Sequence, residues 1–135
     1  APGMALGAER LTAAMLEEGL HYPKMNGKKV FTHAVRRMGE VLGECLAANG
    51  VTLDQVDLFL FHQANLRINE MLASELKIPA EKVFNTIQKY GNTTAATLPI
   101  GMAEAEKAGK LKKGMLVASA AFGSGFTWAS ALYRW

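Results

Sequence analysis

The clearest regularity in the chain is a run of apolar residues at three- and four-residue spacing that begins near Val30. Its members are Phe31, Ala34, Val35, Met38, Val41, Leu42, Cys45 and Leu46. This spacing places them on one face of a helix, and Asn49 with Gly50 forms a good C-terminal stop. Weaker patterns predict helices over residues 5–18, 64–76 and 93–108.

Short apolar runs between these helices predict four strands. They cover residues 56–61, 83–87, 115–121 and 127–135, and the segment "FGSGF" at 122–126 separates the last two. The first and third runs are almost wholly apolar, which is typical of strands covered on both faces. A turn is predicted at Tyr90-Gly91-Asn92. Helices and strands alternate, so the pattern favours an α/β layered domain that ends in an antiparallel hairpin.

Length and composition agree with one globular domain. The chain has 135 residues, half of them apolar, which is enough to bury a core. No apolar run approaches the roughly 18 residues of a membrane span, and the first residues lack the basic and apolar regions of a signal peptide. We therefore expect a cytoplasmic protein without a membrane span. Residue 1 is Ala1 and not methionine, so we expect a processed chain or a piece of a longer one.

Charge and metal-binding residue types give little support to two other classes of function. The net charge is +3, but Lys and Arg occur in scattered pairs and not in one block, so we expect no nucleic-acid partner. The three histidines (His21, His33 and His62) show no ligand spacing, and Cys45 is the only cysteine. The sequence thus predicts no metal site and no redox cofactor.

Three polar or glycine-rich elements each stand where a predicted buried strand ends. They are "HQAN" at 62–65, "GNTT" at 91–94 and "GSG" at 123–125. Each alone has a simpler interpretation, as a helix cap, a turn or a tight hairpin connection. In layered α/β folds, however, ligands are usually handled at strand ends. A histidine, an asparagine amide and a backbone N–H together can donate hydrogen bonds to a developing oxyanion.

The segments "NGKKVFTHAVRRM", "HQANLRI", "YGNTTAAT" and "AFGSGFTWASALYRW", in this order and spacing, carry a resemblance to a known family. They are similar to the C-terminal half of β-ketoacyl-acyl-carrier-protein synthase III, a condensing enzyme. The resemblance covers residues 25–135, and residues 1–24 match less clearly. It implies a thiolase-like layered α-β-α-β-α fold, of which residues 1–135 would form the C-terminal half, with a mixed sheet.

The resemblance also implies roles for individual residues. His62 and Asn92 would be catalytic, because both would donate hydrogen bonds to the thioester oxygen of a malonyl group as it loses carbon dioxide. The backbone N–H of Ser124 would complete the oxyanion hole for the acyl-enzyme step. The remaining implied positions concern the substrate: Gly27, Phe31 and Asn65 along the pantetheine arm, Phe122 bordering the active site, and Arg67 meeting coenzyme A or the carrier protein.

Two departures from the family pattern bear on these roles. The family acylates a cysteine that comes from its N-terminal half, whereas Cys45 lies on the apolar stripe and is predicted to be a core residue. We therefore expect half an active site here. The second departure is Ser124, which stands within a run that is usually three glycines. If that position needs a positive φ, serine would hold it less well than glycine.

The resemblance implies a condensing enzyme that joins an acyl starter to malonyl-acyl-carrier protein by decarboxylative Claisen condensation. Two alternatives stay open: a related acyl transfer or head-to-head acyl condensation, and a non-catalytic fragment that binds carrier protein. The implied partners are the missing N-terminal half, acyl carrier protein, acyl-coenzyme A and a second copy of the complete fold. No cofactor is expected, since coenzyme A and phosphopantetheine thioesters would be substrates.

Overall fold

The computed structural model describes residues 12–22 and 24–135, which divide into two units, one up to Val30 and one over 31–135. The first unit contains α1 (Ala13–Glu17). The Thr12 side chain accepts a 3.2 Å hydrogen bond from the Met15 N–H and so caps this helix. Gly19, with φ of 68°, follows its end. The helix expected over 5–18 is thus confirmed at 13–17, and residues 5–11 lie outside the described residues.

The long amphipathic helix is confirmed as α2 (Gly27–Ala48). It begins three residues earlier than the apolar pattern predicts, because the Asn26 side-chain oxygen accepts a 3.1 Å hydrogen bond from the Lys29 N–H. Cys45 is only partly buried. It lies at the border of the stripe, so its prediction as a core residue is only partly right. The fully buried members of the stripe are Ala34, Val35, Met38, Leu42 and Leu46.

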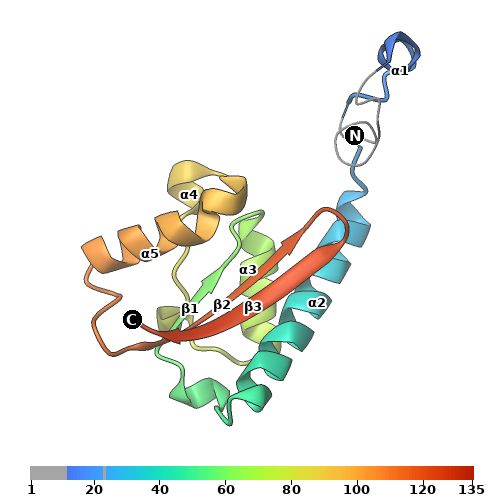
Figure 1. Ribbon diagram of the computed structural model, residues 1–135. Helices are drawn as coiled ribbons and strands as arrows, with labels where there is room; N and C mark the ends of the chain where they lie inside the picture. The colour runs from blue at the N-terminus through green and yellow to red at the C-terminus, as the bar shows by residue number, and fades with distance from the viewer. Residues whose placement is uncertain (1–11, 23) are drawn as a thin grey trace. The chain divides into compact units, whose positions relative to one another are not determined.

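The second unit is built on a mixed sheet of three strands in the order β1-β2-β3 (Figure 1). These are β1 (Leu58–Phe61), β2 (Leu116–Gly123) and β3 (Thr127–Arg134). β1 and β2 are parallel, whereas β2 and β3 form an antiparallel hairpin. The predicted α/β class and terminal hairpin are confirmed. β2 extends two residues beyond its predicted end, so the connection to β3 is only residues 124–126.

The strand predicted over 83–87 is wrong. Val83 alone bridges to Phe59, in parallel, and the Phe84 N–H donates to the Phe59 carbonyl at 3.2 Å. Two residues further on, the N–H groups of Thr86 and Ile87 donate to the side-chain oxygen of Gln63. Because a side chain takes the place of a neighbouring strand, the pairing ends there. The chain turns instead into the short helix α4 (Ile87–Tyr90).

The other helices begin later than predicted, for local reasons. α3 (Leu66–Glu75) starts after Asn65, whose side-chain oxygen accepts a 3.0 Å hydrogen bond from the Arg67 N–H. α5 (Thr97–Lys107) starts after the single turn η4 (Thr94–Ala96), because Thr94 has a φ of 51° that no α-helix accommodates. Two further short turns are η2 (Leu53–Gln55) and η3 (Ala80–Lys82).

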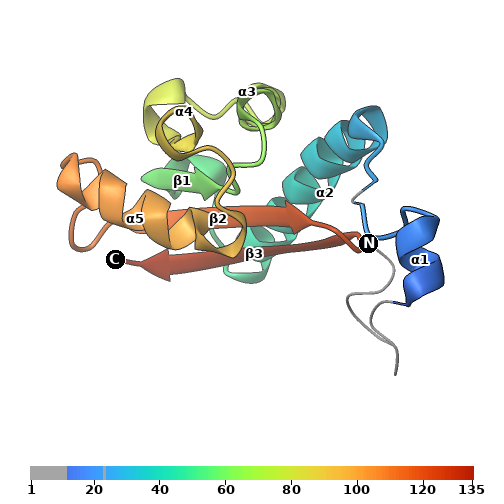
Figure 2. The ribbon, with the colours of Figure 1, turned by 90° about the horizontal axis from the view of Figure 1, so that it is seen from above.

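Helices cover both faces of the sheet (Figure 2). On one face, α5 contributes Ala105 to a buried cluster. The other members of this cluster are Leu58, Leu60, Leu111 and Val117. Alternate residues of β3 contact α2 on the other face. There the Ser130 hydroxyl donates a 2.7 Å hydrogen bond to the Val41 carbonyl, and the Arg37 guanidinium lies 4.9 Å from the Trp128 ring centre. β1 is buried along its whole length.

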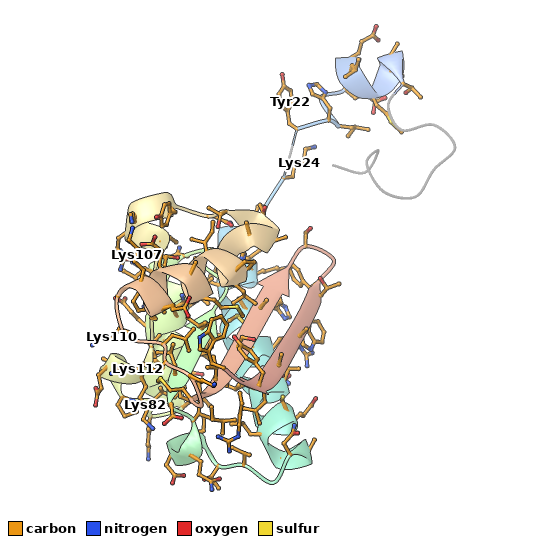
Figure 3. The ribbon with its side chains drawn as sticks, turned by 60° about the vertical axis from the view of Figure 1, so that its left-hand side comes forward. Tyr22, Lys24, Lys82, Lys107, Lys110 and Lys112 are labelled. Atoms are coloured by element: carbon orange, nitrogen blue, oxygen red, sulfur yellow. The ribbon has the colours of Figure 1, made fainter. Side chains whose placement is uncertain are left out.

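Four lysines lie along one side of the second unit: Lys82, Lys107, Lys110 and Lys112 (Figure 3). The Lys82 Nζ donates to the carbonyls of Asp54 and Val56, at 2.8 and 2.7 Å, and so ties η3 to the end of η2. Lys107, Lys110 and Lys112 are exposed. Within residues 12–22 and 24–135, no helix combines the length and the apolar character needed to cross a membrane.

Candidate active site

His62 follows β1 directly and is held by the sheet. Its backbone N–H donates a 2.9 Å hydrogen bond to the Ala120 carbonyl, which continues the pairing of β1 with β2 by one residue. The side chain is partly buried, and this burial lowers the pKa of the imidazole below its ordinary value of 6.5. At neutral pH the ring is therefore neutral and has one N–H to donate.

Asn92 follows α4 through a backbone conformation that only glycine adopts readily. Gly91 has φ of 66° and ψ of −158°. The Asn92 side-chain oxygen then accepts a 2.9 Å hydrogen bond from the Thr94 N–H. Since this bond engages the oxygen, the amide presents Nδ2 as its hydrogen-bond donor. Asn92 itself is exposed.

The third element is the turn between β2 and β3. Phe122, near the end of β2, is buried, and its ring centre lies 4.9 Å from that of Phe126. Ser124 is not among the residues with positive φ, whereas Gly125 has a φ of 151°. A side chain on Gly125 would lie 2.8 Å from the Thr127 methyl carbon. Position 125 of this turn therefore requires glycine, whereas position 124 is compatible with serine.

The strand directions place His62 and the β2–β3 turn at the same end of the sheet, and the segment that leads to Asn92 runs toward that end. β1 and β2 run in parallel, so His62 and Phe122 both lie where their strands end. The bridge of Val83 to Phe59 is also parallel, so the segment that leads to α4 and Asn92 runs in the same direction. We call this the carboxyl end of the sheet. It is the position at which α/β folds usually bind ligands.

The other predicted site residues lie on α2 and α3. Phe31 is partly buried on α2, Asn65 caps α3, and Arg67 is exposed in the first turn of α3. Gly27 opens α2 in the first unit, and a Cβ added at this glycine would have open space within 4 Å. In the described part of the chain, no three His, Cys, Asp or Glu side chains are grouped so that they could hold a metal ion.

The sequence prediction assigned no role to a buried amide network next to His62. Gln63 is 2 % exposed and Asn69 is 0 % exposed. Both donate hydrogen bonds to the side-chain oxygen of Asn85, at 3.1 and 2.8 Å. The available signal was a glutamine two residues after a buried strand, where an unpartnered amide would be costly. Its partners, 22 residues further along the chain, are evident only from the fold.

Comparison with known proteins accounts for this arrangement. Residues 46–135 match the family model described as "3-Oxoacyl-[acyl-carrier-protein (ACP)] synthase III C terminal". The chain belongs to this family. The predicted resemblance is thus confirmed. The matched residues include His62, Asn92 and Ser124.

Individual relatives are similar to this chain over most of its length. The β-ketoacyl-[acyl-carrier-protein] synthase III of Roseiflexus castenholzii is 46% identical over 131 residues, which are 96% of this chain and 40% of the relative. The solved 3-oxoacyl-[acyl-carrier-protein] synthase III of Aquifex aeolicus is 48% identical, with a TM-score of 0.84 over 87% of this chain and 38% of that one. The Thermus thermophilus structure is 40% identical, with a TM-score of 0.81 over 83% and 35%.

These similarities confirm the predicted fold class, a thiolase-like α/β fold of which this chain forms a part. The chain spans about 40% of the length of the curated relatives that it matches.

Proposed function

We propose that this chain is the C-terminal part of a condensing enzyme that joins an acyl starter to malonyl-acyl-carrier protein in fatty acid or related biosynthesis. The observation that supports this most strongly is that His62 follows β1 directly and that Asn92 follows a segment bridged in parallel to the same strand. One is a neutral imidazole, and the other is an amide whose oxygen is already engaged. Two neutral N–H donors suit an oxyanion that forms during the reaction.

In the proposed reaction, the bond between the malonyl carbon and its carboxylate breaks, and carbon dioxide leaves. The electron pair moves onto the thioester oxygen and forms an enolate, to which His62 and Asn92 donate hydrogen bonds. The enolate carbon then attacks the carbonyl carbon of an acyl group carried on a cysteine, and the cysteine thiolate leaves. The Ser124 N–H would stabilise the oxyanion of that second step. Such preorganised donors contribute most where water is excluded.

The thioester substrates would reach this site by their pantetheine arm. We assign Gly27, Phe31 and Asn65 to the walls along that arm, and the buried ring of Phe122 to the border of the active site. Arg67, exposed in the first turn of α3, would meet the phosphates of coenzyme A or the acidic carrier protein.

The nucleophilic cysteine would come from an N-terminal half that packs against this chain, and two complete folds would form a dimer. The sheet supports this proposal, because β3 has only β2 as a neighbour among the described strands. Exposed edges of this kind are usually covered. Phe126 in the hairpin turn and Trp128 in β3 are 44 % and 41 % exposed, and large apolar side chains of this exposure favour a partner surface.

Substitution of the two donors tests the proposal in the enzyme assembled with its N-terminal half. We expect His62→Ala and Asn92→Ala each to lower malonyl decarboxylation by about 10²-fold or more, measured as carbon dioxide release. Acylation of the cysteine, measured by mass spectrometry of the intact protein, should persist. Asn49→Ala is the control, since Asn49 follows α2 and its side chain donates a hydrogen bond to the Cys45 carbonyl.

Wild-type decarboxylation in both His62→Ala and Asn92→Ala would overturn the assignment. Product analysis separates the alternatives: transfer of the acyl group to oxygen or nitrogen, or condensation of two acyl chains, would indicate a related reaction on the same fold. A complete absence of acyl adduct on any associated chain would indicate a non-catalytic carrier-binding fragment.

A further inference from the structure

Gln63, the residue after His62, uses both ends of its side-chain amide in a buried setting. Its nitrogen donates hydrogen bonds to the Phe61 carbonyl at 2.9 Å and to the Asn85 side-chain oxygen at 3.1 Å. Its oxygen accepts hydrogen bonds from the backbone N–H groups of Thr86 and Ile87, at 3.0 and 3.1 Å. With only 2 % of the residue exposed, these bonds have no competition from solvent.

The two backbone groups bound by Gln63 open the helix that leads to Asn92. Thr86 precedes α4, and Ile87 is its first residue, but the Thr86 side chain makes no capping hydrogen bond. The first N–H groups of any helix lack partners within the helix. Here the Gln63 oxygen supplies the acceptor that an N-cap side chain usually provides.

α4 has little stability of its own, because it is a single turn of four residues. Its position therefore depends on what holds its ends. Gln63 holds the first end, and Gly91 with Asn92 follows the last one. Behind Gln63, the fully buried Asn69 of α3 donates to the same Asn85 oxygen at 2.8 Å. The network thus joins the end of β1, α3 and the start of α4.

We propose that Gln63 is a positioning residue that sets the distance between the His62 and Asn92 donors. The backbone of Gln63 is covalently bonded to His62. Its side chain is hydrogen-bonded to the first N–H groups of α4, the helix that precedes Asn92. The inference rests on the proposed function, since the spacing of the two donors matters only if both bind one oxyanion. A displacement of about 1 Å in such a site can cost on the order of 10²-fold in rate.

Two substitutions test the length of the Gln63 side chain and its hydrogen-bonding groups separately. Gln63→Met keeps the length of the side chain but removes the oxygen that binds Thr86 and Ile87, whereas Gln63→Asn keeps the amide but shortens it by one methylene. In the assembled enzyme we expect Gln63→Asn to lower kcat for malonyl decarboxylation by about 10- to 100-fold. KM for the malonyl thioester and the rate of cysteine acylation should not change. Gln63→Met should lower kcat to a similar extent, because it also releases the two N–H groups that open α4.

Hydrogen exchange on this chain reads the proposed bonds directly. The Thr86 and Ile87 amides should be protected in the wild type, and should exchange at least about tenfold faster in Gln63→Asn and Gln63→Met. Asn69→Leu is the matched control within the network, because it removes a buried amide and leaves the bonds of Gln63 to α4 in place. It should leave kcat near the wild-type value.

The outcomes distinguish this inference from the proposed function. If His62→Ala abolishes decarboxylation but Gln63→Asn and Gln63→Met keep the wild-type kcat, the positioning role is wrong and the proposed function stands. If His62→Ala decarboxylates at the wild-type rate, the proposed function itself fails. Unprotected Thr86 and Ile87 amides in the wild type overturn the positioning role even if a Gln63 variant does not fold.

Discussion

The Asn92 side-chain oxygen accepts a 2.9 Å hydrogen bond from the Thr94 N–H, so the orientation of the amide is set before any substrate binds. Asn92→Asp keeps this acceptor but replaces the Nδ2 donor with a second acceptor oxygen. We expect malonyl decarboxylation by the assembled enzyme to fall by about 10²- to 10³-fold, with an unchanged melting temperature. Carbon dioxide release and thermal unfolding measure the two effects. A variant that loses stability but retains its rate would contradict the assignment.

Gly91 connects α4 to Asn92 with φ of 66° and ψ of −158°. Gly91→Ala should destabilise the fold by about 1–3 kcal/mol, because residues with a side chain strain this conformation. The matched control is Gly43→Ala in the middle of α2, where nothing lies within 4 Å of the added Cβ. That change should stabilise by about 0.5–1 kcal/mol. Urea unfolding of both variants provides the measurement, and equal effects would refute the conformational argument.

Burial lowers the pKa of His62 below 6.5, so the unfolded chain binds a proton more readily than the native one. The neutral, partly buried imidazole therefore lets the fold keep its full free energy of unfolding above about pH 6.5. This free energy declines as the pH falls from there through the native pKa. NMR titration of the imidazole should give a midpoint below that of an exposed histidine. His62→Gln should flatten the dependence of unfolding free energy on pH in this window, and an unchanged slope would disprove the effect.

The hairpin turn separates a tolerant position from an intolerant one. Gly125→Ala places a methyl group 2.8 Å from the Thr127 methyl carbon at a φ of 151°, so we expect a loss of about 1–3 kcal/mol. Ser124 has no positive φ, and Ser124→Gly should cost less than about 1 kcal/mol. Denaturant unfolding of the pair tests this order. The reverse order would mean that serine is the strained residue.

Asn65 caps α3 through the Arg67 N–H, a role separate from its proposed contact with pantetheine. Asn65→Ala should destabilise by about 0.5–2 kcal/mol, whereas Asn65→Asp keeps the cap and should not. If Asn65 also lines the pantetheine arm, Asn65→Asp should raise KM for the thioester without a change in stability. Normal KM values in both variants would limit Asn65 to the cap.

Local patterns predicted much of this molecule because the information was local. The apolar stripe from Phe31 to Leu46 fixes a helical face whatever it packs against. The apolar runs around Phe59 and Val117 indicated two buried strands, and the glycine pair at 123 and 125 indicated the hairpin. Three short motifs at their family spacing were enough to identify the family that residues 46–135 match.

Contacts between distant segments decided the rest. The segment 83–87 has the pattern of a strand, yet the Gln63 oxygen binds the N–H groups of Thr86 and Ile87 and turns the chain into α4. Asn26 and Asn65 set helix starts that apolar periodicity does not mark. The sequence by itself thus determined the segments and the chemistry of His62 and Asn92. Only the tertiary structure decided how the segments that carry them are joined, because parallel pairing and a buried amide connect residues more than twenty positions apart.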